Sequence, residues 1–168
     1  MQKYHPRRNT VSCLSVMLTP PVAVRADASV AEAIDLMFRQ RVRTLPVVDA
    51  QDVYQGLFGI QFLLKELLPR AATLDPGRGM LDLGFMQDTL DDVRSSLKER
   101  LAALYPQRVG TAVHREIAPL SVQDSLLEAM LRVYQAGCSL PVVDEKTHKL
   151  VGIVSHWSIL AKLTGRTP

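Results

Sequence analysis

The sequence predicts an α+β fold in which two pseudo-symmetric β-α-β-β-α repeats pack as one module, with a partly helical insert between them. The main observation behind this prediction is that three short segments recur in the same order, each 95 or 96 residues later. The second observation is that the apolar runs and the helical patterns follow one another in the same order in both copies. Because a duplicated unit forms clefts between its halves, we expect function there. The recurring pairs are residues 29–34 with 125–130, 45–49 with 140–144, and 56–58 with 152–154.

The composition limits the kind of protein. The 168 residues suffice for one compact domain or two small ones that share a core, and the 47% hydrophobic content is typical of globular proteins. The net charge of +3 permits an anionic partner, but it is too small to predict nucleic-acid binding. Two cysteines make no disulfide framework, and no apolar run approaches the ~18 residues of a membrane span. We expect a cytoplasmic protein without membrane insertion.

The first repeat is expected over residues 11–68. It begins with a short strand at residues 22–24, after which Ser29 and Glu32 form a capping box that starts a helix. Strands follow at residues 45–48 and 56–60, and a second helix covers about residues 61–68. The first helix has an apolar face that consists of Val30, Ala33, Ile34 and Met37.

The second repeat, over residues 109–165, has the same order of elements. Ser125 and Glu128 start its first helix, and strands are expected at residues 140–143 and 150–154. Gly165 ends a closing helix that starts at Ser155. The apolar face of the first helix carries Leu126, Met130 and Val133.

The insert covers residues 69–108. Turns are expected at residues 73–79, and an amphipathic helix over about residues 88–104, which Thr89 and Asp92 can cap. Its apolar stripe must be buried against the module or against a partner, and we favour the module. The stripe consists of Leu90, Val93, Leu97, Leu101 and Leu104.

Both repeats resemble cystathionine-β-synthase (CBS) domains. The resemblance lies in Leu45-Pro46-Val47-Val48-Asp49 with Gly56-Leu57-Phe58, in Leu140-Pro141-Val142-Val143-Asp144 with Gly152-Ile153-Val154-Ser155, and in the opening Val16-Met17-Leu18-Thr19-Pro20. The pair is similar to a Bateman module over about residues 11–68 and 109–165. This resemblance implies a regulatory protein that binds an adenosine-containing ligand between its repeats (AMP, ADP, ATP or S-adenosylmethionine). It also implies a homodimer formed through the helices.

The ligand signature of the family is Gly-h-x-Thr/Ser-x-x-Asp, in which h is apolar. The resemblance implies that the hydroxyl binds phosphate or ribose and that the Asp accepts hydrogen bonds from the ribose. In the first repeat these positions hold Gly59 and Phe62, which predicts a vestigial site. In the second repeat Ser155 keeps the hydroxyl, whereas Ser158 replaces the Asp with a shorter neutral group. We therefore expect one altered site, near the second signature.

Eight residues are candidates for this site by resemblance. Four belong to the second signature, two border the adenine base, and two lie in the entry segment of the second repeat as donors for phosphate. The last two are equally well explained as solvent-facing residues, and His156 as a surface residue at a helix N-terminus. The eight are Gly152, Ser155, His156 and Ser158, then Leu140 and Pro141, then His114 and Arg115.

No catalytic or metal-ligating pattern occurs in the sequence. The four histidines lack metal-ligand spacing, and Cys13 and Cys138 are interpreted as small apolar residues. We expect a non-enzymatic regulatory module that senses an adenosyl ligand and signals to an effector protein. The alternative is a degenerate pair that acts only as a dimerisation or protein-interaction scaffold. The missing signature aspartates favour the alternative, whereas Ser155, His114 and Arg115 favour ligand binding.

Overall fold

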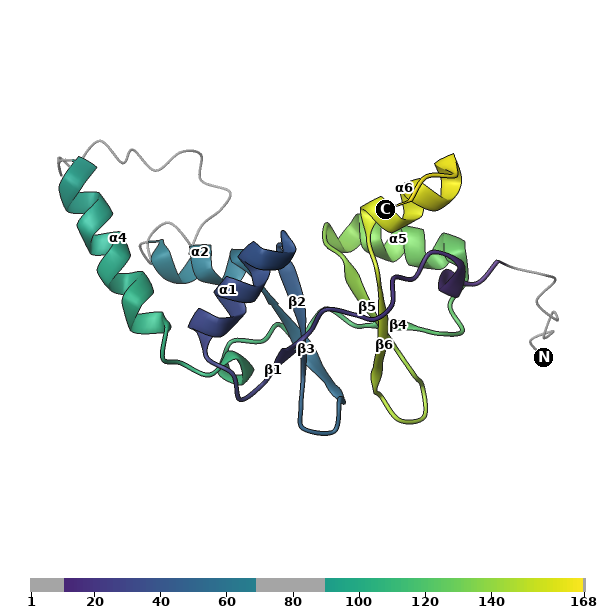
Figure 1. The fold of residues 1–168 in the computed structure, drawn as a ribbon, viewed down its shortest axis with the longest axis horizontal. Coiled ribbons are helices and arrows are strands. Elements are labelled where there is room, and N and C mark those ends of the chain that lie inside the picture. Colours follow the sequence, from purple (N-terminus) through teal and green to yellow (C-terminus); the bar gives the residue numbers. More distant parts are fainter. Residues whose placement is uncertain (1–10, 69–89, 168) are drawn as a thin grey trace, which may run out of the picture.

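Two three-stranded sheets with their helices make up the computed structural model, which describes residues 11–68 and 90–167 (Figure 1). The two repeats have the same order of elements, and the predicted α+β fold of two β-α-β-β-α units is confirmed. The first repeat consists of β1 (Val24–Arg25), α1 (Val30–Gln40), β2 (Thr44–Val48), β3 (Tyr54–Gly59) and α2 (Ile60–Leu67). The insert contributes α4 (Leu90–Leu104). The second repeat consists of β4 (Leu120–Ser121), α5 (Leu126–Ala136), β5 (Leu140–Val143), β6 (Leu150–Val154) and α6 (His156–Thr164).

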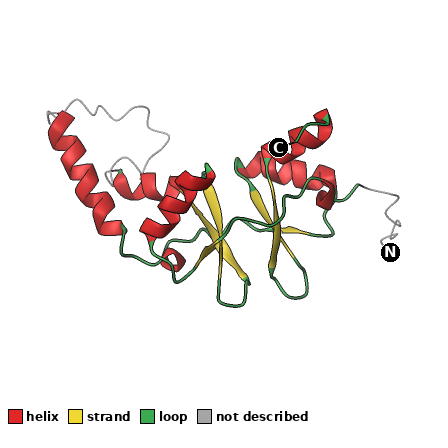
Figure 2. Ribbon diagram, in the orientation of Figure 1, coloured by secondary structure: helices red, strands yellow, loops and turns green. Residues whose placement is uncertain are grey.

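The two sheets have the same topology. The middle strand, β2 or β5, pairs in parallel with the strand before it and antiparallel with the strand after it. The antiparallel register shifts between Val47 and Val48 in one sheet, and between Val142 and Val143 in the other. Figure 2 shows the two sheets side by side, with the helices outside them. The duplication has therefore kept a local irregularity of the backbone as well as the order of elements.

Several element boundaries differ from the sequence prediction by one or two residues, and the hydrogen-bond pattern explains two of them. Strand β1 begins at Val24 instead of residue 22, because only Val24 and Arg25 pair with β2. Helix α2 begins one residue early, at Ile60, whose N–H donates to Arg43 O at 3.0 Å. Neither difference moves the residues of the predicted site.

Helices α1 and α5 start at equivalent serines. In α1, Ser29 Oγ accepts the N–H of Glu32 at 3.2 Å, and Glu32 Oε2 accepts the N–H of Ser29 at 2.7 Å. This confirms the predicted capping box. In α5, Ser125 Oγ accepts the N–H of Glu128 at 3.2 Å, and the reciprocal bond is missing among the described residues. The first repeat thus has the more complete helix cap.

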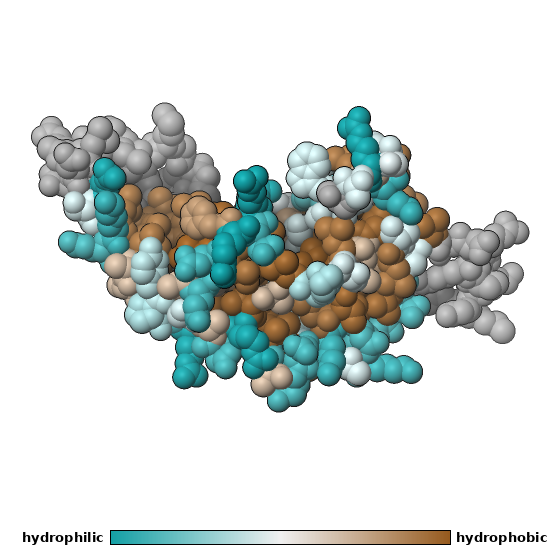
Figure 3. All heavy atoms as spheres, viewed as in Figure 1, coloured by the Kyte–Doolittle hydropathy of each residue, from teal (hydrophilic) through white to brown (hydrophobic). Residues whose placement is uncertain are grey.

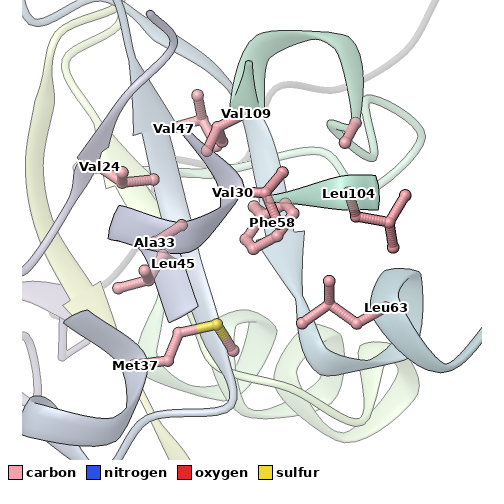
Figure 4. Close-up of a cluster of buried hydrophobic side chains, with 11 residues drawn as sticks. Val24, Val30, Ala33, Met37, Leu45, Val47, Phe58, Leu63, Leu104 and Val109 are labelled. Atoms are coloured by element: carbon pink, nitrogen blue, oxygen red, sulfur yellow. The ribbon is translucent and has the colours of Figure 1, made fainter. Parts of the chain in front are cut away.

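The core of each repeat includes residues from the entry segment of the other repeat. The short helix η1 (Cys13–Ser15) lies against α5, and Cys13 and Val16 are buried in the core of the second repeat. The short helix η3 (Val109–Thr111) lies against β1, and Val109 and Ala112 are buried in the core of the first. Figure 4 shows Val109 beside Val47 in this core. Because the chain crosses over in both directions, the repeats form one module.

The contacts between the repeats follow a pseudo-twofold axis. Leu18 forms a bridge with Ile153, and their equivalents 96 residues away, His114 and Leu57, form the same bridge. Val53 forms a bridge with Lys149, which is its own equivalent. The axis therefore passes through this last bridge, between the two hairpins.

The insert helix α4 covers one side of the first repeat. It packs against α2, and Arg100 donates to Leu67 O at 2.9 Å and to Leu68 O at 3.4 Å. Leu104 is buried in the core beside Phe58 and Leu63 (Figure 4), and the partly buried Leu101 packs against this core. The preferred burial of the stripe against the module is confirmed for these two leucines, whereas Leu97 stays 38% exposed. The expected turns at residues 73–79, the Thr89 cap, and the side chains of Leu90 and Val93 lie outside what the structure describes.

Candidate functional site

The glycine of each signature lies against an entry segment of the chain. A Cβ on Gly152 would stand 2.3 Å from the Met17 side chain and 3.0 Å from Leu18 O. A Cβ on Gly56 would stand 3.0 Å from His114 O, and the φ of Gly56, +144°, is rarely adopted by residues with side chains. Close backbone packing therefore explains why glycine stands at both positions, Gly152 included.

Ser155 and Ser158 cap the N-terminus of α6 for each other. The N–H of Ser158 donates to Ser155 Oγ at 2.9 Å, and the N–H of Ser155 donates to Ser158 Oγ at 2.9 Å. The hydroxyl of Ser158 also donates to Ser155 O at 3.0 Å. This is a capping box in which serine takes the place of the usual Glu or Gln. The sequence that suggests a ligand site is thus also the start of a helix.

The two serine hydroxyls differ in what they offer a ligand. Ser158 is 3% exposed, and its hydroxyl both donates and accepts, so a direct bond to ribose would require opening the cap. Ser155 is half-buried, and within the described hydrogen bonds its hydroxyl only accepts. Its proton is therefore available to a phosphate or ribose oxygen. Ser155 fits a ligand contact, whereas the hydroxyl of Ser158 is engaged in the helix start.

The first signature has an apolar surrounding. Gly59 is the N-cap of α2 and supplies no side-chain hydrogen bond. Phe62 packs against Phe58 with ring centroids 5.5 Å apart, and it meets the ring of His114 edge-on at 6.4 Å. These phenyl rings contain no acceptor for a ribose hydroxyl.

The structure attaches His114 to the first repeat and not to the second signature. His114 and Leu57 exchange both backbone hydrogen bonds, at 2.8 and 3.1 Å. The side chain pairs with Glu116, Nδ1 to Oε1 at 2.9 Å. The backbone N–H of Glu116, followed by this bond, lowers the pKa of that carboxyl. Arg115 is the next residue and is exposed. The predicted eight residues are therefore divided between two places.

This division follows from the crossing entry segments. His114 belongs to the entry segment of the second repeat, but its backbone pairs with Leu57 on β3 of the first repeat before the chain reaches β4. The segment against the second signature is instead Met17 and Leu18, which the sequence analysis did not include in the site. The offset of 96 residues between the repeats could have indicated this segment, because it makes Leu18 the equivalent of His114.

The other predicted residues differ in accessibility. Leu140 and Pro141 are fully buried in β5, and Leu140 belongs to the core of the second repeat. His156, the first residue of α6, is exposed. These positions bring His156 and Ser155 together at one helix N-terminus, whereas Leu140 and Pro141 lie in the sheet below.

Two buried polar atoms of the described residues have no hydrogen-bond partner. They are the hydroxyl of Tyr54 and Nε2 of His114. Burial raises the pKa of Tyr54 well above its usual range, and nearby Cys138 adds to this. Burial also raises the pKa of both thiols, Cys13 and Cys138, which makes them poorer nucleophiles at neutral pH. Cys13 is buried in the core of the second repeat, and the half-buried Cys138 packs against the same core.

Two further findings concern residues 11–68 and 90–167. No group of three or more His, Cys, Asp or Glu side chains within them is arranged to hold a metal ion. No helix in this part of the chain combines the length and the apolar character that a membrane span requires.

Comparisons with solved structures show the same fold. The chain is similar to CBSX2, whose crystal structure is a complex with AMP, at 21% identity, with 92% of this chain and 97% of that chain covered and a TM-score of 0.62. A putative acetoin utilization protein (AcuB) from Vibrio cholerae is similar at 17% identity, with coverages of 93% and 92% and a TM-score of 0.65. The CBS domain of a CBS domain containing membrane protein from Sphaerobacter thermophilus is similar at 20% identity, with coverages of 90% and 86% and a TM-score of 0.59.

Comparisons of sequence identify the family. A search of the curated proteins finds no match. The family model of the CBS domain matches twice, at residues 12–61 and at residues 109–165, which together make up more than half of the chain. The first match contains β1 to β3 and ends at the start of α2, and the second contains β4 to α6. The chain therefore belongs to the CBS domain family, as a tandem pair.

Proposed function

We propose that the chain is a non-enzymatic regulatory module that binds one adenosyl ligand beside the second signature and signals to an effector protein. The observation that carries the proposal is the half-buried hydroxyl of Ser155 at the N-terminus of α6, whose proton is available to a ligand. The N-terminus of a helix favours anions, because its first N–H groups and the helix dipole are directed there. An AMP, ADP or ATP phosphate meets both requirements.

A similar protein supports this ligand class. CBSX2 shares the fold, and its crystal structure is a complex with AMP. In this chain the proposal assigns the ligand to the second signature, because Ser155 is there and the first signature presents Gly59 and Phe62 instead. It does not depend on His114 and Arg115, which belong to the side of the first repeat.

The second candidate function is a scaffold for dimerisation or protein interaction without a ligand. The observation that favours it is the state of Ser158, which replaces the signature Asp, is 3% exposed, and uses its hydroxyl in the helix cap. A ribose would lack the charged acceptor that this position supplies in the family signature. The loss of one such charge-assisted bond costs about 1.5–3 kcal/mol.

A thermal-shift experiment separates the two functions. AMP, ADP, ATP, S-adenosylmethionine and NADH are each added to the full chain, since a ligand that binds the native state raises the melting temperature. At one hundred times its Kd, a ligand adds about 2.7 kcal/mol to the free energy of unfolding. We expect at least one adenine compound to raise the melting temperature, and Ser155→Ala to reduce that rise. No shift with any of the five at millimolar concentration would favour the scaffold.

Ser158→Asp is the sharper variant. It restores the family acceptor and is expected to tighten adenosine binding roughly tenfold, equivalent to ~1.4 kcal/mol. Ser155→Ala is expected to weaken binding by a similar factor. Equal affinity of the wild type and both variants would show that the ligand does not bind at this signature.

A further inference from the structure

The second signature lies at one end of its sheet. Strand β6 ends at Val154, which pairs with Leu140, the first residue of β5, and α6 begins two residues later, at His156. Helix α5 ends at Ala136, four residues before β5 begins. We call the start of β5, the end of β6 and the N-terminus of α6 the signature end of the second repeat. A ligand that contacts Ser155 lies at this end.

The described elements at the signature end carry no carboxylate. Helix α6, strands β5 and β6 and the entry segment at residues 11–18 contain neither Asp nor Glu. Helix α5 has Glu128, but this residue is in its first turn, whereas the chain reaches the signature end from its last turn. An ionised carboxylate has two oxygens and can accept hydrogen bonds from two neighbouring hydroxyls at once. The paired hydroxyls of a ribose therefore meet no acceptor of this kind on these elements.

Carboxylates of the second sheet lie at its other end. Asp144 follows β5, and its Oδ1 accepts the N–H groups of Lys146 and Thr147 inside the hairpin. Glu145 is the next residue and accepts the hydroxyl of Ser121 at the end of β4. Figure 3 shows hydrophilic side chains along the edge of the molecule where the two hairpins lie in Figure 1. The four residues of β5 separate these acids from the signature end by roughly 10 Å.

The charge near the signature end is positive instead. Cys138 stands two residues before β5. Burial raises the pKa of its thiol, and the nearby guanidinium of Arg43, from the first repeat, opposes this rise. The end that lacks carboxylates on its own elements therefore has a cation close by, which favours an anionic part of a ligand.

Ser158 is satisfied without a ligand. Its hydroxyl accepts the N–H of Ser155 at 2.9 Å and donates to Ser155 O at 3.0 Å, and the residue is 3% exposed. A site rejects an analogue that lacks a hydroxyl when its own polar groups are then left unpaired. Because the cap of α6 already pairs Ser158, a ligand without a ribose hydroxyl leaves no group of this residue unpaired.

Ser155 has one proton to offer, and a phosphate is its better acceptor. Within the described hydrogen bonds the Ser155 hydroxyl only accepts, so its donor is uncommitted. A hydrogen bond to an ionised acceptor is roughly twice as strong as one between neutral groups. A phosphate oxygen therefore gains more from this proton than a ribose hydroxyl does.

We propose that the site beside the second signature binds an adenine nucleotide through its phosphate and does not recognise the ribose hydroxyls, so that AMP and 2′-deoxy-AMP bind alike. This rests on the proposed function and adds to it the part of the ligand that the site selects. Residue 158 decides the ribose selectivity. Serine uses its hydroxyl in the helix start, whereas a carboxylate there would keep one oxygen for the helix start and one for the ribose.

Calorimetric titration of the full wild-type chain compares AMP, 2′-deoxy-AMP, 3′-deoxy-AMP and adenosine. The three nucleotides are expected to have Kd values within about twofold of one another, and adenosine, which lacks the phosphate, is expected to bind at least about tenfold more weakly. An AMP preference of about tenfold or more over either deoxy compound, or adenosine that binds as tightly as AMP, overturns the inference and leaves the proposed function standing. If none of the nucleotides binds, the proposed function fails, and the inference fails with it.

Two variants of residue 158 sharpen the comparison. Ser158→Asp is expected to bind AMP about tenfold more tightly than 2′-deoxy-AMP, because its second oxygen is free to accept the ribose hydroxyls. Ser158→Ala is the matched control, which removes one partner of the cap and should lower the melting temperature while the ratio of the two Kd values stays near one. A ratio that changes in Ser158→Ala, or equal binding of both compounds by Ser158→Asp, overturns the inference. The comparison on the wild type does not depend on the folding of either variant.

Discussion

The two repeats share their backbone and differ in the side chains that face a ligand or a partner. In both repeats a signature glycine packs against the entry segment of the other repeat. Both cores also include residues from that entry segment. The first repeat differs in having Phe62 in its signature and α4 packed on its side. The second has kept the Ser155 hydroxyl and an open apolar face. The comparison suggests that duplication preserved what folds the module and allowed the surfaces to specialise.

The largest expected difference between the repeats concerns the two signature glycines. Gly56→Ala places a Cβ 3.0 Å from a backbone oxygen at a φ of +144°, which side chains rarely adopt. Its expected cost is roughly 2–4 kcal/mol of unfolding free energy, since backbone strain of this kind costs about 1–3 kcal/mol before the close contact is added. Gly152→Ala meets mainly the flexible side chain of Met17, and its expected cost is about 1–2 kcal/mol.

Urea denaturation of both variants checks this order. Gly137→Ala serves as a control for a left-handed residue with open surroundings, because no atom lies within 4 Å of its added Cβ. It measures the cost of a left-handed φ of +64° in the absence of a close contact. If Gly152→Ala is the more damaging of the two signature variants, the packing of the entry segments does not have the described asymmetry.

A smaller difference is expected at the helix caps. Ser29 takes part in a reciprocal capping box with Glu32, whereas Ser125 makes only its own bond to the N–H of Glu128. Ser29→Ala is expected to cost about 1 kcal/mol, the usual value for an N-cap. Ser125→Ala should cost a few tenths of a kcal/mol less, because no second bond is lost with it. Thermal unfolding of the two variants at neutral pH measures the difference, and equal costs would show that the reciprocal bond adds nothing.

The smallest expected effects depend on pH. The backbone N–H of Ser29, followed by its hydroxyl, lowers the pKa of Glu32 in the first repeat, and the backbone N–H and hydroxyl of Thr147 lower the pKa of Asp144 in the second. Each carboxylate therefore stabilises the fold above its unfolded pKa, about 4.3 for Glu and 3.9 for Asp, and this contribution is lost as the pH falls through the folded value. Glu32→Gln and Asp144→Asn should each reduce stability at pH 7 and flatten its decline below about pH 4.5.

Salt provides the control for these pH effects. Glu32 is exposed and Asp144 is half-buried, so part of the electrostatic contribution should weaken at high ionic strength. Stability curves of the wild type and the two variants that run parallel from pH 7 to pH 3 would contradict the assigned hydrogen bonds.

Much of the fold was predictable from local sequence. The capping box of Ser29 and Glu32, the strand motif around Pro46 and Pro141, and the helix end at Gly165 all depend on residues close to one another in the chain. Such signals act over a few residues and therefore survive without knowledge of the tertiary structure. The repetition doubled the helix-start and strand signals, which is why the order of elements was correct.

The arrangement of the site was less predictable, for two physical reasons. His114 was placed with the second signature because it belongs to the entry segment of the second repeat, but its backbone pairs with Leu57 of the first repeat. Such a long-range pairing has no local signal. Ser158 was placed at the ribose, but its hydroxyl satisfies the backbone of Ser155 at the helix start. A serine at this position can serve a cap or a ligand, and the sequence does not distinguish the two uses.

Calorimetric titration of the full chain with AMP tests the inequality of the two signatures most directly. Because Ser155 stands at one signature and Phe62 at the other, we predict one AMP bound per chain, with binding weakened about tenfold, or ~1.4 kcal/mol, in Ser155→Ala. Phe62→Asp should leave the affinity of that site unchanged. Two equivalent sites per chain, or a single site that Phe62→Asp alters and Ser155→Ala does not, would contradict the account.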